Sequence, residues 1–126
     1  MNQCASAQNC SEKFDANFWA KNLRVEIAGD FPNCDSCYLK IVDKRTGLEN
    51  KQFRISHFFS EYYKGREYLF SVPHTDSKFN EFDVAQLDKM HSGYFLRIID
   101  IYVVCIKCKE CVVTLKPISE TIWPTK

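Results

Sequence analysis

Apolar and polar residues alternate over short stretches of this chain, which is the pattern of half-buried β-strands. Residues 23–27 alternate apolar and charged side chains, and residues 94–106 form the strongest strand signal, rich in Tyr, Ile and Val. Further strands are expected at residues 38–42, 52–59, 68–72 and 112–115. Residues 82–90 fit neither the two-residue period of a strand nor the 3.6-residue period of a helix, and are compatible with a strand or a short helix. The pattern therefore predicts a mainly β fold.

One domain accounts for most of the chain. Residues 21–116 carry the strand signals, and we expect residues 1–20 and 117–126 to be tails. The chain has 126 residues, of which 45% are hydrophobic, and a formal net charge of +1. That composition supports a buried core and excludes a disordered chain and one that holds nucleic acid or membrane by bulk charge. The longest apolar run, residues 98–106, is interrupted by Asp100 and is too short for a membrane span.

Cysteine is the residue type that most needs explaining. Seven are present: Cys4, Cys10, Cys34, Cys37, Cys105, Cys108 and Cys111. Two Cys-x-x-Cys units far apart in sequence are what a tetrahedral zinc site uses, because each two-residue spacer lets both sulfurs face one metal. Cys34 and Cys37 supply the first unit, but the second can be Cys105 with Cys108 or Cys108 with Cys111. The sequence alone leaves this choice open.

The redox state of these cysteines depends on the compartment. The N-terminus has neither the basic nor the apolar segment of a signal peptide. If Met1 is the native start, the chain stays in the cytoplasm or nucleus, where such units are metal ligands more often than disulfides. If a leader has been removed, the protein is secreted and disulfides are expected instead. Cys4 and Cys10 fit the disulfide alternative and have no role in the zinc model.

The order of motifs resembles that of the Yippee-like and Mis18 proteins. The segments that carry the resemblance are residues 34–37, 55–59, 65–70, 92–94, 100–102 and 105–109. The resemblance implies a β-tent, which has two antiparallel sheets pinned at one end by zinc. It also implies that the four ligands are Cys34, Cys37, Cys105 and Cys108. Family members of this kind are interaction modules in centromere or ubiquitin-ligase complexes, and oligomerisation through the tent is implied too.

Catalytic signatures are missing from the sequence. There is no glycine-rich phosphate loop, no Gly-x-Ser-x-Gly and no His-Glu-x-x-His. We therefore expect an interaction module that binds protein partners and is not an enzyme. Tyr62 and Tyr63 are expected to be exposed in a loop and to contact the partner.

Two other function classes stay open. One is a secreted, disulfide-stapled β-sandwich of fibronectin-III or cytokine-receptor type that binds a protein ligand. The other is a nucleic-acid end binder, for which the basic residues near the last cysteines would form the contact: Arg97, Lys107, Lys109 and Lys116. A solvated basic face is the commoner explanation of such a cluster.

Overall fold

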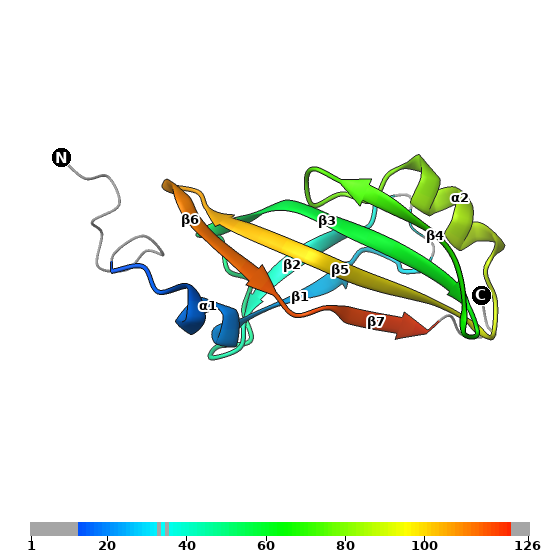
Figure 1. Cartoon of the computed structure of the whole chain (residues 1–126), viewed down its shortest axis with the longest axis horizontal. Helices are drawn as coiled ribbons and strands as arrows, with labels where there is room; N and C mark the ends of the chain where they lie inside the picture. Colours follow the sequence, from blue (N-terminus) through cyan, green and yellow to red (C-terminus); the bar gives the residue numbers. More distant parts are fainter. Residues whose placement is uncertain (1–12, 33, 35, 122–126) are drawn as a thin grey trace.

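The computed structural model describes residues 13–32, 34 and 36–121, and this part of the chain folds into seven strands and two short helices (Figure 1). The helices are α1 (Ala16–Asn22) and α2 (Glu81–Lys89). The strands are β1 (Leu23–Ala28), β2 (Tyr38–Asp43), β3 (Phe53–Lys64), β4 (Glu67–His74), β5 (Tyr94–Cys105), β6 (Cys108–Leu115) and β7 (Ile118–Thr121).

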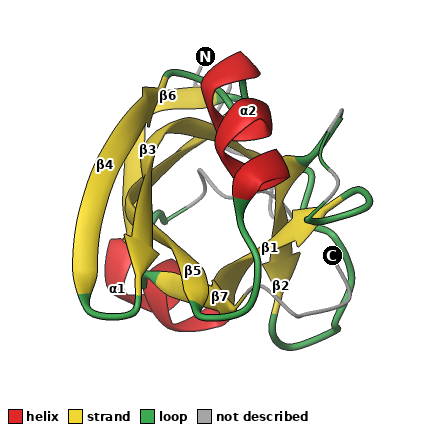
Figure 2. Cartoon of the chain, turned by 90° about the vertical axis from the view of Figure 1, so that its right-hand side faces the viewer, coloured by secondary structure: helices red, strands yellow, loops and turns green. Residues whose placement is uncertain are grey.

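Two antiparallel sheets make up the fold. β1 and β2 form one, and the other has the strand order β4-β3-β5-β6, with β7 pairing with β5. Viewed end-on, the larger sheet curves around the core, with the β1–β2 sheet on the opposite side and α2 covering part of the gap (Figure 2). The prediction of a mainly β fold with two antiparallel sheets is confirmed.

Both helices begin at a capping side chain. Asp15 accepts hydrogen bonds from the first backbone N–H groups of α1, and Trp19 then packs its ring 5.2 Å from that of Phe53. Asn80 and Asp83 form a capping box that starts α2, so residues 82–90 are mostly helical. Neither helix in the described part of the chain is long and apolar enough to cross a membrane.

The core lies between the two sheets. It is built from the inward-facing residues of alternate strand positions, as the period-2 pattern requires. Among those with no measurable exposure are Phe58, Tyr62, Leu96, Ile98, Ile101 and Val103. Within the regular stretches of β3 and β5, on either side of the irregularities in register, alternate residues point inward, and the residues between them form a second, outward-facing surface of the large sheet.

Candidate functional site

The predicted zinc ligands lie in two separate places. Cys34 and Cys37 precede β2, and the backbone N–H of Phe79, just before α2, donates to the carbonyl of Cys37 (3.1 Å). Cys105 ends β5 and Cys108 begins β6, and these two residues face each other in the strand register. The β5–β6 turn is at the opposite end of the large sheet from α2 (Figure 1).

The sulfur atoms of the first pair are bonded to each other. Cys34 and Cys37 form a disulfide, and Cys105 is disulfide-bonded as well. Zinc needs thiolate ligands, so disulfide sulfurs do not supply them. Within residues 13–32, 34 and 36–121, no three Cys, His, Asp or Glu side chains are grouped as a metal-ligand set. Zinc binding by Cys34, Cys37, Cys105 and Cys108 stays a prediction, and it applies to the protein in which these cysteines are reduced.

Cys111, the alternative ligand, lies on the inner face of β6. Its thiol is buried, with 6% of the residue exposed. The thiol of Cys108 is half-buried and contacts the carboxylate of Glu110, with 3.7 Å between Sγ and Oε1. The two side chains thus differ in exposure. Cys4 and Cys10 lie outside the described residues.

The two tyrosines predicted to contact a partner point in opposite directions. Both lie within β3 and not in a loop, because the strand continues to Lys64. Tyr62 points into the core and is 0% exposed, so the expectation that it is exposed is wrong. Tyr63 is its outward neighbour and is half-buried. Burial of Tyr62 is possible because its hydroxyl donates to the carboxylate of Asp83.

A buried polar network surrounds that carboxylate. Asp83 accepts hydrogen bonds from the hydroxyls of Ser60 and Tyr62, from His74 Nε2 and from the backbone N–H of Asn80. Burial opposes ionisation of Asp83, but these hydrogen bonds outweigh it and lower the pKa of the carboxyl below its ordinary value. Burial also raises the pKa of Tyr62, whose hydroxyl therefore stays protonated as a donor.

The residue types of this network are those of a serine hydrolase, but the geometry differs. His74 Nε2 contacts both Ser60 Oγ (2.9 Å) and Asp83 Oδ2 (3.1 Å), whereas its Nδ1 contacts the carbonyl of Lys78 (3.1 Å). A catalytic triad needs the serine and the carboxylate on opposite ring nitrogens. Ser60 and Asp83 are 0% exposed and His74 is 5% exposed. The network therefore connects β3, β4 and α2 and offers no nucleophile to a substrate.

The tautomer of His74 follows from these partners. A backbone carbonyl only accepts, so Nδ1 carries a hydrogen for Lys78. The ionised carboxylate of Asp83 also only accepts, so Nε2 carries a hydrogen as well. Both ring nitrogens of His74 therefore have hydrogen-bond partners inside the protein.

A row of aromatic side chains crosses the outward surface of the large sheet. Tyr63 on β3 faces Tyr68 on β4 and Phe95 on β5 in the strand register. The rings of Tyr63 and Phe95 are parallel with centroids 4.6 Å apart, and those of Tyr63 and Tyr68 meet edge-on at 5.7 Å. Tyr68 is 51% exposed. Three neighbouring strands therefore present one aromatic surface to solvent.

An ion pair lies beside this aromatic row. In the next outward-facing register position Glu61 faces Arg97, with 3.4 Å between Oε1 and Nη1. Glu61 also accepts a hydrogen bond from the hydroxyl of Tyr63 (3.0 Å). Partial burial and this hydrogen bond raise the pKa of Tyr63. The Arg97 side chain is 43% exposed and that of Glu61 only 16%, so the guanidinium is the more accessible charge.

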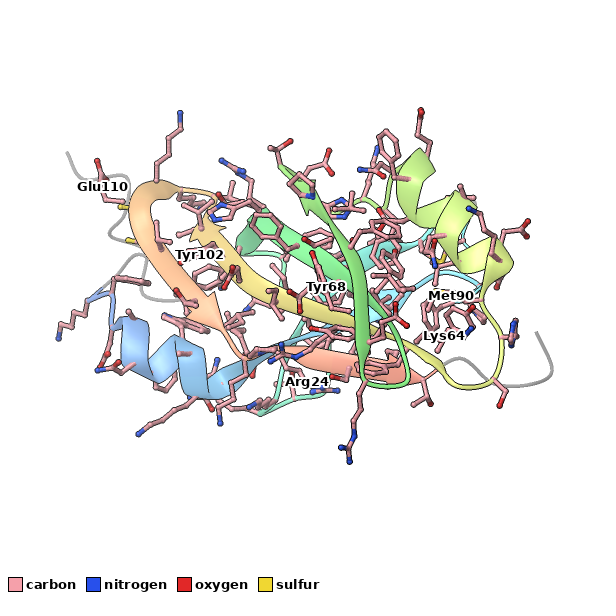
Figure 3. The ribbon with its side chains drawn as sticks, turned by 45° about the vertical axis from the view of Figure 1, so that its right-hand side comes forward. Arg24, Lys64, Tyr68, Met90, Tyr102 and Glu110 are labelled. Carbon is pink, nitrogen blue, oxygen red and sulfur yellow. A yellow bond between two sulfur atoms is a disulfide. The ribbon has the colours of Figure 1, made fainter. Side chains whose placement is uncertain are left out.

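The surface continues along the sheet beyond the ion pair. Phe59 faces Ile99 in the next outward position, and the ring of His57 stacks on that of Tyr102 at 4.3 Å. Figure 3 labels Tyr68 on β4 and Tyr102 on β5. We call this surface the outer face. Its residues are His57, Phe59, Glu61, Tyr63, Tyr68, Phe95, Arg97, Ile99 and Tyr102.

Of this face, sequence reasoning named Tyr63 as a partner-binding residue and Arg97 only as part of a basic cluster. The missed signal is the alternation within β3, where Phe58, Ser60 and Tyr62 point inward. The residues between them therefore point outward with Tyr63. Ser60 interrupts the apolar series, and for that reason the strand was predicted to end before it.

The chain matches no protein-family model, and no significant match was found among curated proteins or solved structures. The assignment of a site therefore depends on the geometry alone.

Proposed function

We propose that this chain is a non-catalytic β domain that binds a protein partner through the outer face. The observation that supports the proposal is the aromatic row of Tyr68, Tyr63 and Phe95, with Arg97 beside it. Tyr and Arg are enriched among the residues that dominate binding energy at protein interfaces. Aromatic rings held by stacking also lose little conformational freedom when a partner binds.

The charge of the face favours a protein over a nucleic acid. Nucleic-acid surfaces need an excess of Lys and Arg to neutralise phosphates. Arg97 is paired with Glu61 on the outer face, and the whole chain has a net charge of only +1. An apolar patch with one internal ion pair is the composition of a protein interface.

The disulfides support the extracellular alternative for this module. Cys34–Cys37 and the disulfide of Cys105 are stable in an oxidising compartment. The second candidate is the zinc-bound, intracellular Yippee-like or Mis18-like module. The register pairing of Cys105 with Cys108 favours it, because the turn between β5 and β6 brings both residues to one end of the hairpin.

Metal content and thiol count separate the two forms. The purified protein is assayed for zinc by elemental mass spectrometry and for thiols by labelling after denaturation without reductant. A peptide that links Cys34 to Cys37 and an absence of zinc are expected for the extracellular module. Zinc bound in proportion to the chain, with unfolding on addition of a chelator, would instead support the zinc module.

The partner surface is tested by site-specific photo-crosslinking. p-Benzoylphenylalanine replaces Tyr68 on the outer face or, as a control, Leu48, which is 69% exposed in the β2–β3 loop. We expect crosslinks to one protein at position 68 that are absent at position 48. Excess unlabelled wild-type chain should compete for them, and the Arg97→Ala variant should compete poorly.

Binding to the purified crosslinked partner then gives the energetic test. Tyr68→Ala and Arg97→Ala are each expected to weaken the affinity about tenfold or more, and Leu48→Ala to leave it within about twofold. A crosslinked species of two copies of this chain would identify the partner as a second copy. Equal competition by wild type and Arg97→Ala would refute the outer face as the binding surface.

A further inference from the structure

A pocket lies between the start of β2 and the segment that leads into α2. The two chain segments run side by side because Leu39 N–H donates to the carbonyl of Ser77 (2.8 Å) and Phe79 N–H donates to that of Cys37 (3.1 Å). The pocket has a volume of about 480 Å³ and is lined by Ser36, Cys37, Tyr38, Ser77, Lys78 and Phe79. This volume lies in the range of small-molecule sites, roughly 300–1,000 Å³.

Apolar groups form much of the pocket wall. The ring of Phe79 lies next to the rings of Phe58 and His74, with 6.1 Å between the centroids in each pair. Tyr38 is 38% exposed, so its side chain is accessible from solvent. The side chain of Cys37 is held in the disulfide with Cys34. These groups are suited to the apolar part of a ligand.

Four polar side-chain groups at the pocket have no protein partner in the described part of the chain. They are the hydroxyls of Ser36, Tyr38 and Ser77 and the ammonium group of Lys78, for which no hydrogen bond or ion pair is formed with the described residues. The nearby carboxylate of Asp76 accepts the backbone N–H of Lys78 (2.8 Å) and is directed into its own turn. Among the described residues, the polar groups available at the pocket are therefore one cation and three hydroxyls.

We propose that this pocket binds a small molecule that carries a carboxylate on an apolar body. Lys78 pairs with the carboxylate, and the hydroxyls of Ser36 and Ser77 donate hydrogen bonds to it. The apolar body packs against Tyr38, Phe79 and the disulfide. This proposal is independent of the outer face, since it uses none of its residues.

The test uses 4-phenylbutyrate as the probe and 4-phenylbutanol as its neutral counterpart. Binding to the isotope-labelled full chain is followed by nuclear magnetic resonance of the backbone amides. For a ligand of this size we expect a Kd on the order of 1 mM. The largest shift changes should fall on residues 36–39 and 77–79, and the alcohol should bind about 3- to 5-fold more weakly.

Variants identify the groups responsible. Lys78→Gln should weaken 4-phenylbutyrate binding about 3- to 5-fold without changing the affinity for the alcohol. Tyr38→Ala should weaken both ligands, because it removes apolar contact area. Lys64→Gln, in the β3–β4 hairpin, is the matched control and should change neither. Equal binding of acid and alcohol, an unchanged affinity in Lys78→Gln, or shifts confined to other residues would refute the pocket.

Discussion

Replacing Asp83 with alanine removes the acceptor on which the buried polar network depends. The hydroxyls of Ser60 and Tyr62 and the imidazole ring of His74 would lose their common acceptor. None of these side chains can reach solvent, since Ser60 and Tyr62 are 0% exposed and His74 is 5% exposed. The variant therefore leaves three buried side chains without their acceptor.

The expected cost is large compared with the stability of a domain of this size. Leaving one buried hydrogen-bond donor without its acceptor costs about 1–3 kcal/mol, and Asp83→Ala does this to three side chains. The whole folding free energy of a domain is about 5–15 kcal/mol. Asp83→Ala should therefore lower the free energy of unfolding by about 3–5 kcal/mol and the melting temperature by roughly 10–25 °C.

Urea denaturation followed by circular dichroism measures this loss. Glu81→Gln is the matched control, because Glu81 lies in the same first turn of α2 but is exposed. Its loss should cost less than about 1 kcal/mol, the value of a charge at a helix end. If Asp83→Ala and Glu81→Gln destabilise the protein equally, the network does not hold α2 to β3 and β4.

The dependence on pH gives a second measure of the same group. The pKa of Asp83 is lower in the folded protein than its ordinary value of 3.8, because its hydrogen bonds outweigh its burial. Its contribution to stability is therefore fully present above the unfolded pKa and is lost as pH falls through the folded pKa. The wild type should lose more stability than Asp83→Ala between about pH 6 and pH 2. Identical pH profiles would contradict an ionised Asp83.

Two further predictions concern backbone conformation, and both are measured by the free energy of unfolding in urea. Asp100 has a φ of +50° within β5, so Asp100→Gly should stabilise the protein by about 0.5–1 kcal/mol, whereas Asp100→Val should destabilise it by more than about 1 kcal/mol. Gly29 and Gly47 both have positive φ, but a Cβ at Gly29 would lie 3.1 Å from Cys37 Cα and one at Gly47 would touch nothing within 4 Å. Gly29→Ala should therefore cost at least about 1 kcal/mol more than Gly47→Ala. Equal costs for the two alanine variants, or a loss of stability in Asp100→Gly, would contradict these assignments.

The sequence predicted the strands whose signals are local. Residues 23–27, 38–42 and 94–106 correspond closely to β1, β2 and β5. The alternation in β1 and the run of Tyr, Ile and Val in β5 are properties of the segments themselves. They require no information about what the segments contact.

The sequence did not predict the end of β3. Ser60 and Glu61 read as polar residues after an apolar strand, so the strand was expected to end at residue 59. Ser60 nevertheless points inward, because Asp83 from a distant helix supplies its hydrogen-bond partner. A pattern that classifies residues only as apolar or polar does not contain this long-range pairing.

The cysteine spacing also could not distinguish metal coordination from a disulfide. Cys34 and Cys37 are separated by two residues, which is compatible with shared coordination of a metal and with the disulfide that the structure contains. The choice depends on the redox state, which is a property of the surroundings of the chain.

The proposed binding surface and the buried network depend on the same strand. Ser60 and Tyr62 fix β3 from the inside through Asp83, and Tyr63, the next residue, points outward from the same backbone. A surface whose backbone is already fixed loses less conformational entropy when a partner binds. The network is therefore expected to increase the affinity for the partner without contacting it, because it holds Tyr63 in the aromatic row before the partner binds.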